Sequence, residues 1–345
     1  MKCYLHIGTE KTATTTIQRF LHSNREKIYS RGCIYTTSLG QVNNFDLSLA
    51  SYNSDRIDDL AMIRELYTRN SLVAWQKLKI AELRSELEPL NSDKIVFSSE
   101  HIQSRLTEIE EITRLKGILN SVGIYDITVI LYIRNPPDLA NSLYSTKVKC
   151  GETDEIPPPP TDPYYNNICN HRYTLEKYSA VFGQSSIVPR IFSGTDFENS
   201  SIVEDFLSVI GIPYSDDFSK PKIENESLSV TGLAVLRRVN QIIPAFVDGK
   251  RNVLREGLVP YFEHYYSDTK YVMPHSIYRR YSEFFRDSNE WVRQRYFPER
   301  ETLFPTNDYP LQTKLQISDK ELDKTAMIIA SIWIDKQRAI LKSAR

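Results

Sequence analysis

The stretch "LHIGTEKTATTTIQRFL", residues 5–21, decides the fold. It joins a short apolar strand, a glycine, a polar turn and a run with helical periodicity, which is the arrangement of a phosphate-binding loop. It departs from the Walker pattern in two places, because Ala13 and Thr14 stand where a second glycine and a lysine are required, ahead of Thr15 at the Ser or Thr position. Lys11 comes three residues too early. The stretch therefore predicts an anion-binding loop that is not built for the triphosphate of ATP.

Short apolar, β-branched runs recur along the chain and have the composition of strands buried on both faces. They are "CYLHIG" (3–8), "KIVFSS" (94–99), "ITVILYIR" (127–134) and "SSIVPRIF" (185–192). Stretches with helical periodicity follow the first three, and "SSIVEDFLSVIGI" (200–212) predicts a helix that ends at Gly211. Strands alternating with helices predict an α/β fold, a P-loop NTPase-like three-layer arrangement with a central parallel sheet.

The rest of the chain is expected to add helices to this core. The segment from about residue 45 to 90, between the first two predicted strands, repeats apolar residues at helical spacing and indicates a helical insertion. Four consecutive prolines in "GETDEIPPPPTDPYY" (151–165) predict an exposed extended loop. The pattern from about 225 to 345 is mainly helical, with "HSIYRRYSEFFRDSNEWVRQRYF" (275–297) as its clearest helix. We expect a single domain over residues 1–345.

Composition excludes several classes of protein. The 43 basic and 44 acidic side chains give a net charge of -1, which provides no global field for nucleic acid or an anionic membrane. The four cysteines are far apart, so neither a zinc site nor a disulfide framework is expected; they are Cys3, Cys33, Cys150 and Cys169. The opening "MKCYLHIG" enters the first predicted strand directly, and no run is long enough to span a membrane. We expect a cytoplasmic protein.

Polar side chains follow three of the predicted strands, at the point where each strand ends. These are Lys11, Thr12, Thr14 and Thr15 after the first strand, Ser99, Glu100 and His101 after the second, and Arg134 and Ser142 after the third. Ligands of parallel α/β sheets collect at the carboxyl ends of the strands. A helix N-terminus suits one phosphate, and a guanidinium fork suits another. The pattern predicts a ligand with phosphates at two separate places.

Two motifs, "KTATTTIQ" (11–18) and "RNPPDLANSLY" (134–144), resemble the sulfotransferases that use 3′-phosphoadenosine 5′-phosphosulfate (PAPS). In that family a Lys-x-Gly-Thr-Thr motif cradles the 5′-phosphosulfate, and an Arg with a Ser eight positions later grips the 3′-phosphate. Arg134 and Ser142 have that spacing, and Ala13 stands where the family usually has Gly. The segments "RGCIYT", "SSEH", "LYSTKVKCGET" and "NESLSVTG" resemble bacterial members.

The resemblance implies transfer of a sulfuryl group from PAPS to an acceptor hydroxyl, with no metal required. Lys11 would stabilise charge on the leaving phosphate oxygen, and Thr14 and Thr15 would hold the 5′-phosphate. Either Glu100 or His101 would take the acceptor proton. Glu100 matches the carbohydrate and tyrosine branches of the family and directly follows a predicted strand, so we favour it over His101, the residue type of the small-molecule branch. A saccharide or glycolipid is the expected acceptor.

Each of these features also has a purely structural explanation. Threonines commonly begin helices, Arg134 could pair with a carboxylate at the sheet edge, and Glu100 could be an acidic residue in the first turn of a capped helix. Two other functions share the predicted fold. One is a nucleotide or small-molecule kinase, but this sequence has Thr14 where the Walker pattern of a kinase has lysine. The other is a non-catalytic protein that binds the nucleotide without turnover.

Overall fold

The computed structural model describes residues 1–220, 228–247, 250–266, 271–305 and 318–343. The chain divides into two compact units, each described here by itself. Unit 1 comprises Met1–Asn135, Pro163–Ile223 and Phe285–Phe304, and unit 2 comprises Pro136–Asp162, Glu224–Phe284 and Pro305–Arg345. The predicted helical C-terminal part and the segment "NESLSVTG" both include positions that lie outside the described residues.

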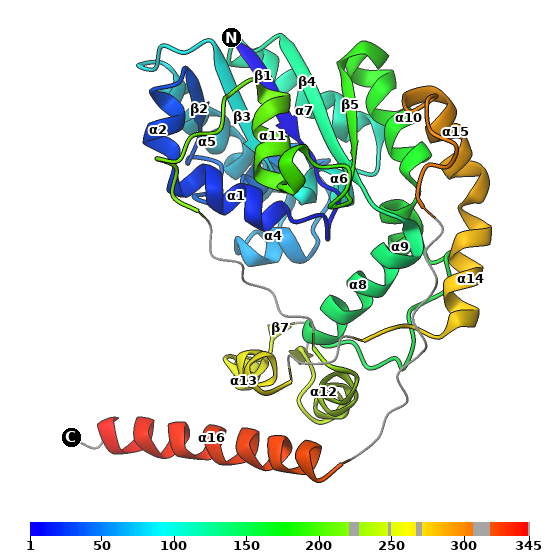
Figure 1. Ribbon diagram of the computed structural model, residues 1–345. Helices are drawn as coiled ribbons and strands as arrows, with labels where there is room; N and C mark the ends of the chain where they lie inside the picture. The colour runs from blue at the N-terminus through cyan, green and yellow to red at the C-terminus, as the bar shows by residue number, and fades with distance from the viewer. Residues whose placement is uncertain (221–227, 248–249, 267–270, 306–317, 344–345) are drawn as a thin grey trace. The chain divides into compact units, whose positions relative to one another are not determined.

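Unit 1 is built on a five-stranded parallel sheet in the order β2-β3-β1-β4-β5 (Figure 1). Its strands are β1 (Lys2–His6), β2 (Cys33–Tyr35), β3 (Lys94–Ser98), β4 (Asp126–Ile133) and β5 (Ile187–Ile191). The predicted α/β class with a central parallel sheet is confirmed. The sequence did not reveal β2, because three residues are too few to establish a strand pattern.

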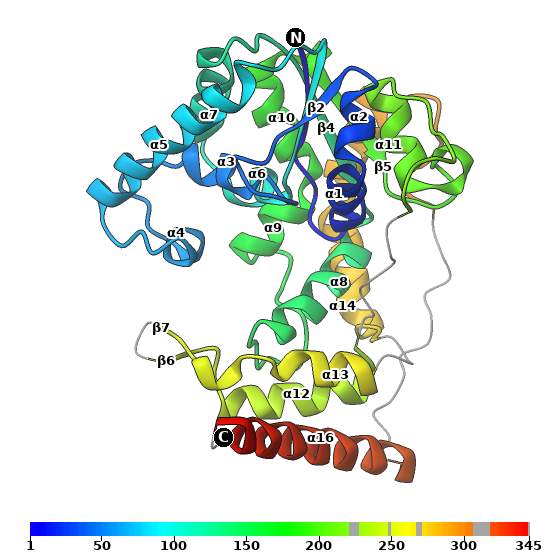
Figure 2. The same cartoon turned by 90° about the vertical axis from the view of Figure 1, so that its left-hand side faces the viewer.

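Helices cover both faces of the sheet and complete the three layers (Figure 2). On one face lie α1 (Thr14–Ser23), α2 (Arg25–Tyr29) and α11 (Ile202–Ile210), and on the other lie α3 (Phe45–Ala50), α5 (Arg69–Leu87), α6 (Glu100–Arg105), α7 (Ile109–Ser121) and α10 (His171–Phe182). Successive residues of β1 alternate between these layers, since Tyr4 packs with α1 whereas Cys3 and Leu5 pack on the opposite face. Burial on both faces explains why the strands are continuously apolar.

The strand register brings three chain segments to one edge of the sheet. His6 at the end of β1 is aligned with Ser98 of β3 and with Ile130 of β4. The pairing continues past β1, because the amide of Tyr132 donates to the carbonyl of Gly8 at 2.7 Å. The residues that follow β1, β3 and β4 therefore emerge together at the carboxyl edge, as predicted.

The helical insertion is present, but a strand that was not predicted, β2, precedes it in the chain. It consists of α3, α4 (Asp59–Ile63) and α5, and it lies between β2 and β3. The expectation that it separates the first two strands was wrong because β2 had been missed. The predicted helix near residues 200–212 is α11, which ends as expected at Gly211 with φ 65°.

The helix predicted over 275–297 is two helices, α14 (His275–Phe284) and α15 (Arg286–Tyr296). They are interrupted at Phe285, a fully buried residue with φ −94° and ψ 5°, and they belong to different units. The apolar spacing continues through the break, so the sequence pattern alone predicts a single helix. The expectation of one domain over residues 1–345 stays a prediction.

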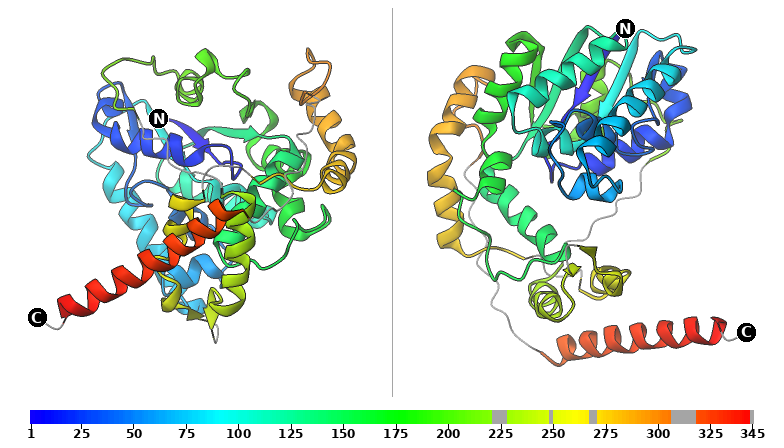
Figure 3. Two further views of the ribbon diagram at one scale, coloured as in Figure 1. Left: turned by 60° about the horizontal axis from the view of Figure 1, so that its bottom comes forward. Right: turned by 180° about the vertical axis from the view of Figure 1, so that it is seen from behind.

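Unit 2 is mainly helical in its described part (Figure 3). Its helices are α8 (Pro136–Lys149), α12 (Val230–Ile242), α13 (Leu258–Tyr265), α14 and α16 (Asp319–Ser343), and β6 (Phe246–Val247) pairs antiparallel with β7 (Lys250–Arg251). Its core joins α8, α12, α13 and α16 through side chains such as Tyr144, Leu233, Phe262 and Ile328.

The four consecutive prolines form neither helix nor strand, as predicted. The segment is less exposed than expected, because Pro157 and Pro160 are buried and the hydroxyl of Tyr281 donates to the carbonyl of Pro158 at 2.7 Å. The predicted loop also ends early, since α9 (Pro163–Cys169) begins at a proline. Proline is favoured at the first turn of a helix, where its missing N–H costs nothing.

Candidate functional site

The loop between β1 and α1 passes directly against the start of α6. Gly8 has φ 115°, and a Cβ added to it would lie 3.2 Å from the Cα of Glu100. A side chain at position 8 would therefore be strained and would push Glu100 away from the loop. The glycine of the opening motif is explained by this close approach.

The loop adopts a left-handed backbone at two non-glycine residues. Lys11 has φ 62°, and Ala13 has φ 57° and ψ 28°. Position 13, where the resembled family usually has glycine, thus keeps a conformation that glycine favours and tolerates a methyl group there. Ala13 precedes α1 and provides no side-chain cap to it. In the described structure the first-turn amides of α1 are left without a side-chain cap, which suits an anion.

Ala13→Gly is expected to raise the free energy of unfolding of unit 1 by up to about 1 kcal/mol. A left-handed conformation costs an L-residue about 1–2 kcal/mol, and the extra freedom of glycine in the unfolded chain offsets part of that gain. Thr16→Gly, in the helical part of α1, is the matched control and should lower the same quantity by about 0.5–1 kcal/mol. Urea denaturation measures both, and a loss in Ala13→Gly equal to that in Thr16→Gly would contradict a left-handed residue 13.

The threonines of the loop divide into buried and partly exposed side chains. Thr12 is fully buried, and its hydroxyl donates to the carbonyl of Thr9 at 2.7 Å. The hydroxyl of Thr9 in turn donates to the carbonyl of Tyr132 in β4 at 3.1 Å. Thr14 is buried at the start of α1, whereas Thr15 is partly exposed. The hydroxyl of Thr12 therefore braces the loop, and the roles of these residues toward a cofactor stay predictions.

Arg134 follows β4 and reaches the same loop. Its Nη1 donates to the carbonyl of Lys11 at 3.0 Å, and its guanidinium carbon lies 5.6 Å from the centroid of the Phe192 ring. The side chain of Arg134 is thus hydrogen-bonded to the backbone of Lys11 within unit 1. Ser142 lies in α8 of unit 2, so its pairing with Arg134 stays a prediction.

His171, which the sequence did not single out, supports Arg134 from α10. Its Nε2 lies 2.7 Å from the carbonyl of Arg134, and its side chain is fully buried. Burial lowers the pKa of His171 to about 4, against a raising contribution from that hydrogen bond. The ring is therefore neutral at pH 7, and because a carbonyl can only accept, Nε2 carries the proton and donates it.

Glu100 is the first residue of α6 and has partners from two distant segments. The helix is capped by Ser99, whose Oγ accepts from the amide of His101 at 3.3 Å. Glu100 therefore lies in the first turn of a capped helix, as its purely structural explanation predicts. The carboxylate Oε2 of Glu100 accepts from Nε2 of Gln18 at 2.8 Å and from Nδ2 of Asn43 at 3.0 Å. Neither amide was a sequence candidate, although Gln18 is the last residue of the stretch "KTATTTIQ".

His101, the alternative base, has a different environment. Its ring lies edge-on to Phe45, with centroids 6.2 Å apart. Its Nδ1 is buried and has no hydrogen-bond partner among the described residues. The choice between Glu100 and His101 stays a prediction that a kinetic experiment can test.

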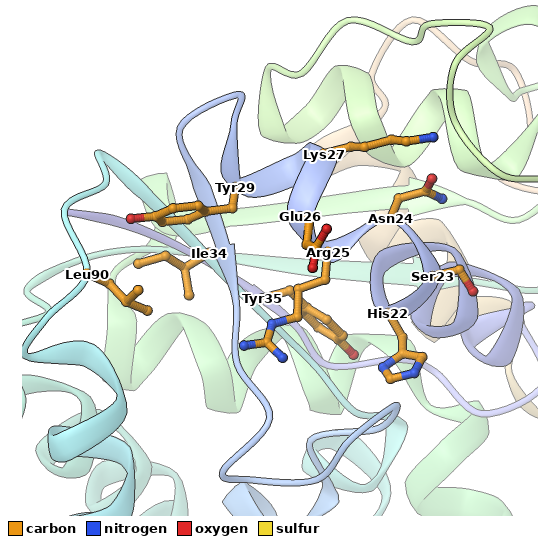
Figure 4. Close-up of a pocket in the computed structure, with 10 residues that line it drawn as sticks. All are labelled: His22, Ser23, Asn24, Arg25, Glu26, Lys27, Tyr29, Ile34, Tyr35 and Leu90. Atoms are coloured by element: carbon orange, nitrogen blue, oxygen red, sulfur yellow. The ribbon is translucent and has the colours of Figure 1, made fainter.

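A cavity of about 490 Å³ opens elsewhere in unit 1 (Figure 4). It lies among the end of α1, α2, β2 and Leu90, and its lining residues are His22, Ser23, Asn24, Arg25, Glu26, Lys27, Tyr29, Ile34, Tyr35 and Leu90. None of the predicted site residues lines it. In the described part of the chain, no group of three or more His, Cys, Asp or Glu residues could hold a metal ion. No helix among those residues is long and apolar enough to cross a membrane.

Comparisons with known proteins give one match. No protein-family model matches the sequence, and no curated protein sequence matches it. Among solved structures, the chain is similar to the crystal structure of a sulfotransferase from Alicyclobacillus acidocaldarius. The match has 17% sequence identity and a TM-score of 0.41, and it covers 70% of this chain and 94% of that chain. At this identity and score the fold assignment stands on the strand order, the register and the loop geometry of this chain.

Proposed function

We propose that this protein is a sulfotransferase that moves a sulfuryl group from PAPS to an acceptor hydroxyl. The observation that carries the proposal is the hydrogen bond from Arg134 to the carbonyl of Lys11. It joins a second anion-binding group to a phosphate-type loop that has Thr14 in place of the Walker lysine. A nucleotide with separate 5′ and 3′ phosphates fits that combination better than the triphosphate of ATP does.

The residues of the loop and its neighbours would each have a distinct role. PAPS supplies an activated sulfuryl group when it is bound. The uncapped amides at the start of α1, with Thr14 and Thr15, would bind the 5′-phosphate, and Lys11 would stabilise the charge left on it. Arg134 would bind the 3′-phosphate through its planar fork. Glu100 would take the proton from the acceptor hydroxyl as general base.

The acceptor class, the absence of a metal requirement and the cellular location are further parts of the proposal. A saccharide or glycolipid hydroxyl is our preferred acceptor, because segments such as "SSEH" resemble bacterial members of the family and the C-terminal half is rich in tyrosine. The proposed roles of Lys11, Arg134 and Glu100 use side chains and backbone amides alone, so we propose that no metal ion is required. The cytoplasmic location also remains a proposal.

A thermal-shift titration tests the nucleotide site without knowledge of the acceptor. Adenosine 3′,5′-bisphosphate at about 100 times its Kd should stabilise the protein by about 2.7 kcal/mol, and ATP with Mg²⁺ should do much less. Arg134→Ala is expected to abolish the preference for the bisphosphate, because the 3′-phosphate loses its guanidinium partner. Arg172→Ala, which removes an exposed arginine paired with Glu176 on α10, is the control and should keep the preference.

The alternative functions give different results in the same titration. Stronger stabilisation by ATP with Mg²⁺ would favour the kinase, and an unchanged melting temperature with either nucleotide would overturn a nucleotide site in this loop. Stabilisation by the bisphosphate, but no product from PAPS with phenols, sugars or water, would favour a non-catalytic binding protein.

A further inference from the structure

The carboxylate of Glu100 is held through one of its two oxygens. Gln18 Nε2 and Asn43 Nδ2 both donate to Oε2, at 2.8 and 3.0 Å. Within the described residues, Oε1 accepts no hydrogen bond. We propose that Gln18 and Asn43 are positioning residues that orient Glu100 so that Oε1 takes the acceptor proton. This inference rests on the proposed function and adds two residues to it.

Gln18 couples the base to the phosphate-binding turn. It lies on α1, four residues after Thr14 and therefore on the same side of the helix, and its side chain is only 2% exposed. Its neighbours Ile17 and Leu21 pack in the apolar layer between α1 and the sheet. A buried amide is costly unless it is hydrogen-bonded, and Glu100 is the partner of this one. One rigid helix thus sets the position of both the 5′-phosphate and the base.

Asn43 is carried by a loop whose shape is set by its own residues. Gly40 has φ 120°, and a Cβ there would lie 2.1 Å from the carbonyl oxygen of Asn43, so only glycine fits. The next residue, Asn44, is fully buried and accepts a hydrogen bond from the amide of Ser98 at 3.0 Å. Since Ser98 ends β3 two residues before Glu100, the same strand end anchors both partners of the contact.

The chemistry of the two partners suits a proton acceptor. Neutral amides fix the direction of a carboxylate without cancelling its charge, whereas a Lys or Arg partner would make it a weaker base. Among the described residues, Glu100 has no ion pair with a Lys or Arg. The geometry is therefore that of a carboxyl group oriented by neutral donors, which differs from the ion-paired Asp205 beside Arg190 in the same unit.

The test measures release of adenosine 3′,5′-bisphosphate from PAPS with water as acceptor. The water oxygen bonds to sulfur, the bond between sulfur and the 5′-phosphate oxygen breaks, and Oε1 takes the water proton before passing it to solvent. Gln18→Met keeps the side-chain volume and removes the donor, so the rate should fall about tenfold or more while the Kd for the bisphosphate stays within about twofold. Asn43→Asp, which puts a like charge beside Glu100, should reduce the rate further.

A double-mutant cycle separates positioning from a general loss of structure. If Gln18 acts through Glu100, then Gln18→Met should cost nothing further in a Glu100→Gln background. Gln76→Met is the matched control, since this buried glutamine on α5 donates to the carbonyls of Leu49 and Tyr52 and should leave the rate unchanged.

Three outcomes are decisive. A wild-type protein that releases no bisphosphate from PAPS, whether or not it binds the bisphosphate, would overturn the proposed function and this inference together. An active wild type whose rate survives Gln18→Met, or falls equally in both backgrounds, would overturn the positioning role and leave the function standing. A loss that disappears in the Glu100→Gln background supports it.

Discussion

Glu100→Gln is expected to lower kcat for sulfuryl transfer by about 10²- to 10⁴-fold while leaving the Kd for adenosine 3′,5′-bisphosphate unchanged. Glutamine has the same shape as glutamate but cannot accept a proton from the acceptor hydroxyl. Its amide carbonyl can still accept the hydrogen bonds from Gln18 and Asn43, so the local structure should be kept. The rate is measured as bisphosphate released from PAPS with a panel of phenols and sugars.

His101→Gln is the comparison variant for that experiment. The ring of His101 packs edge-on to Phe45, so its loss should reduce stability more than turnover. The opposite pattern, in which His101→Gln loses the rate and Glu100→Gln keeps it, would assign the base to His101 instead. The two variants thus decide the choice that the sequence left open.

Unit 1 is expected to lose about 4 kcal/mol of unfolding free energy between pH 7.5 and pH 5 through two buried histidines. Burial lowers the pKa of both His6 and His171 from 6.5 to about 4. The unfolded chain therefore binds protons below pH 6.5 that the folded protein does not bind until about pH 4, so stability falls as the pH falls. Each histidine contributes about 2 kcal/mol by pH 5 and more toward pH 4. Urea denaturation across this range gives the slope.

Variants assign that slope to the two residues. His6 is hydrogen-bonded to Ser98 at 2.8 Å and packed against Tyr132 and Phe206, so His6→Phe should lower stability at pH 7.5 and remove about half of the pH dependence. His171→Gln should remove the other half. His22→Gln, which changes a partly exposed histidine outside the core, is the comparison variant. A wild-type stability that is flat from pH 7.5 to 5 would contradict two neutral buried histidines.

Local patterns predicted much of unit 1, and their failures have physical causes. The continuous apolar runs gave four of the five strands, because burial on both faces leaves a composition that a short window can detect. The strand β2 was missed because three residues carry no period. The break at Phe285 was missed because apolar spacing reports which side of a chain is buried, and a buried residue can also end a helix.

The candidate site also has residues that local patterns predict and residues that they do not. Lys11, Glu100 and Arg134 were predicted because each follows a strand, and parallel strands bring their carboxyl ends to one edge. Ala13 was noted as a departure from the family pattern, and its left-handed backbone shows that the loop keeps a glycine-like conformation at that position.

The sequence by itself determined the parallel sheet, the loop after β1 and the set of polar residues at the strand ends, because these depend on short-range order along the chain. Only the tertiary structure decided that Gln18 and Asn43 meet at one oxygen of Glu100, and that His171 donates to the carbonyl of Arg134. Those contacts join residues 37 to 82 positions apart. They arise from strand register and helix packing, which no local pattern of residues encodes.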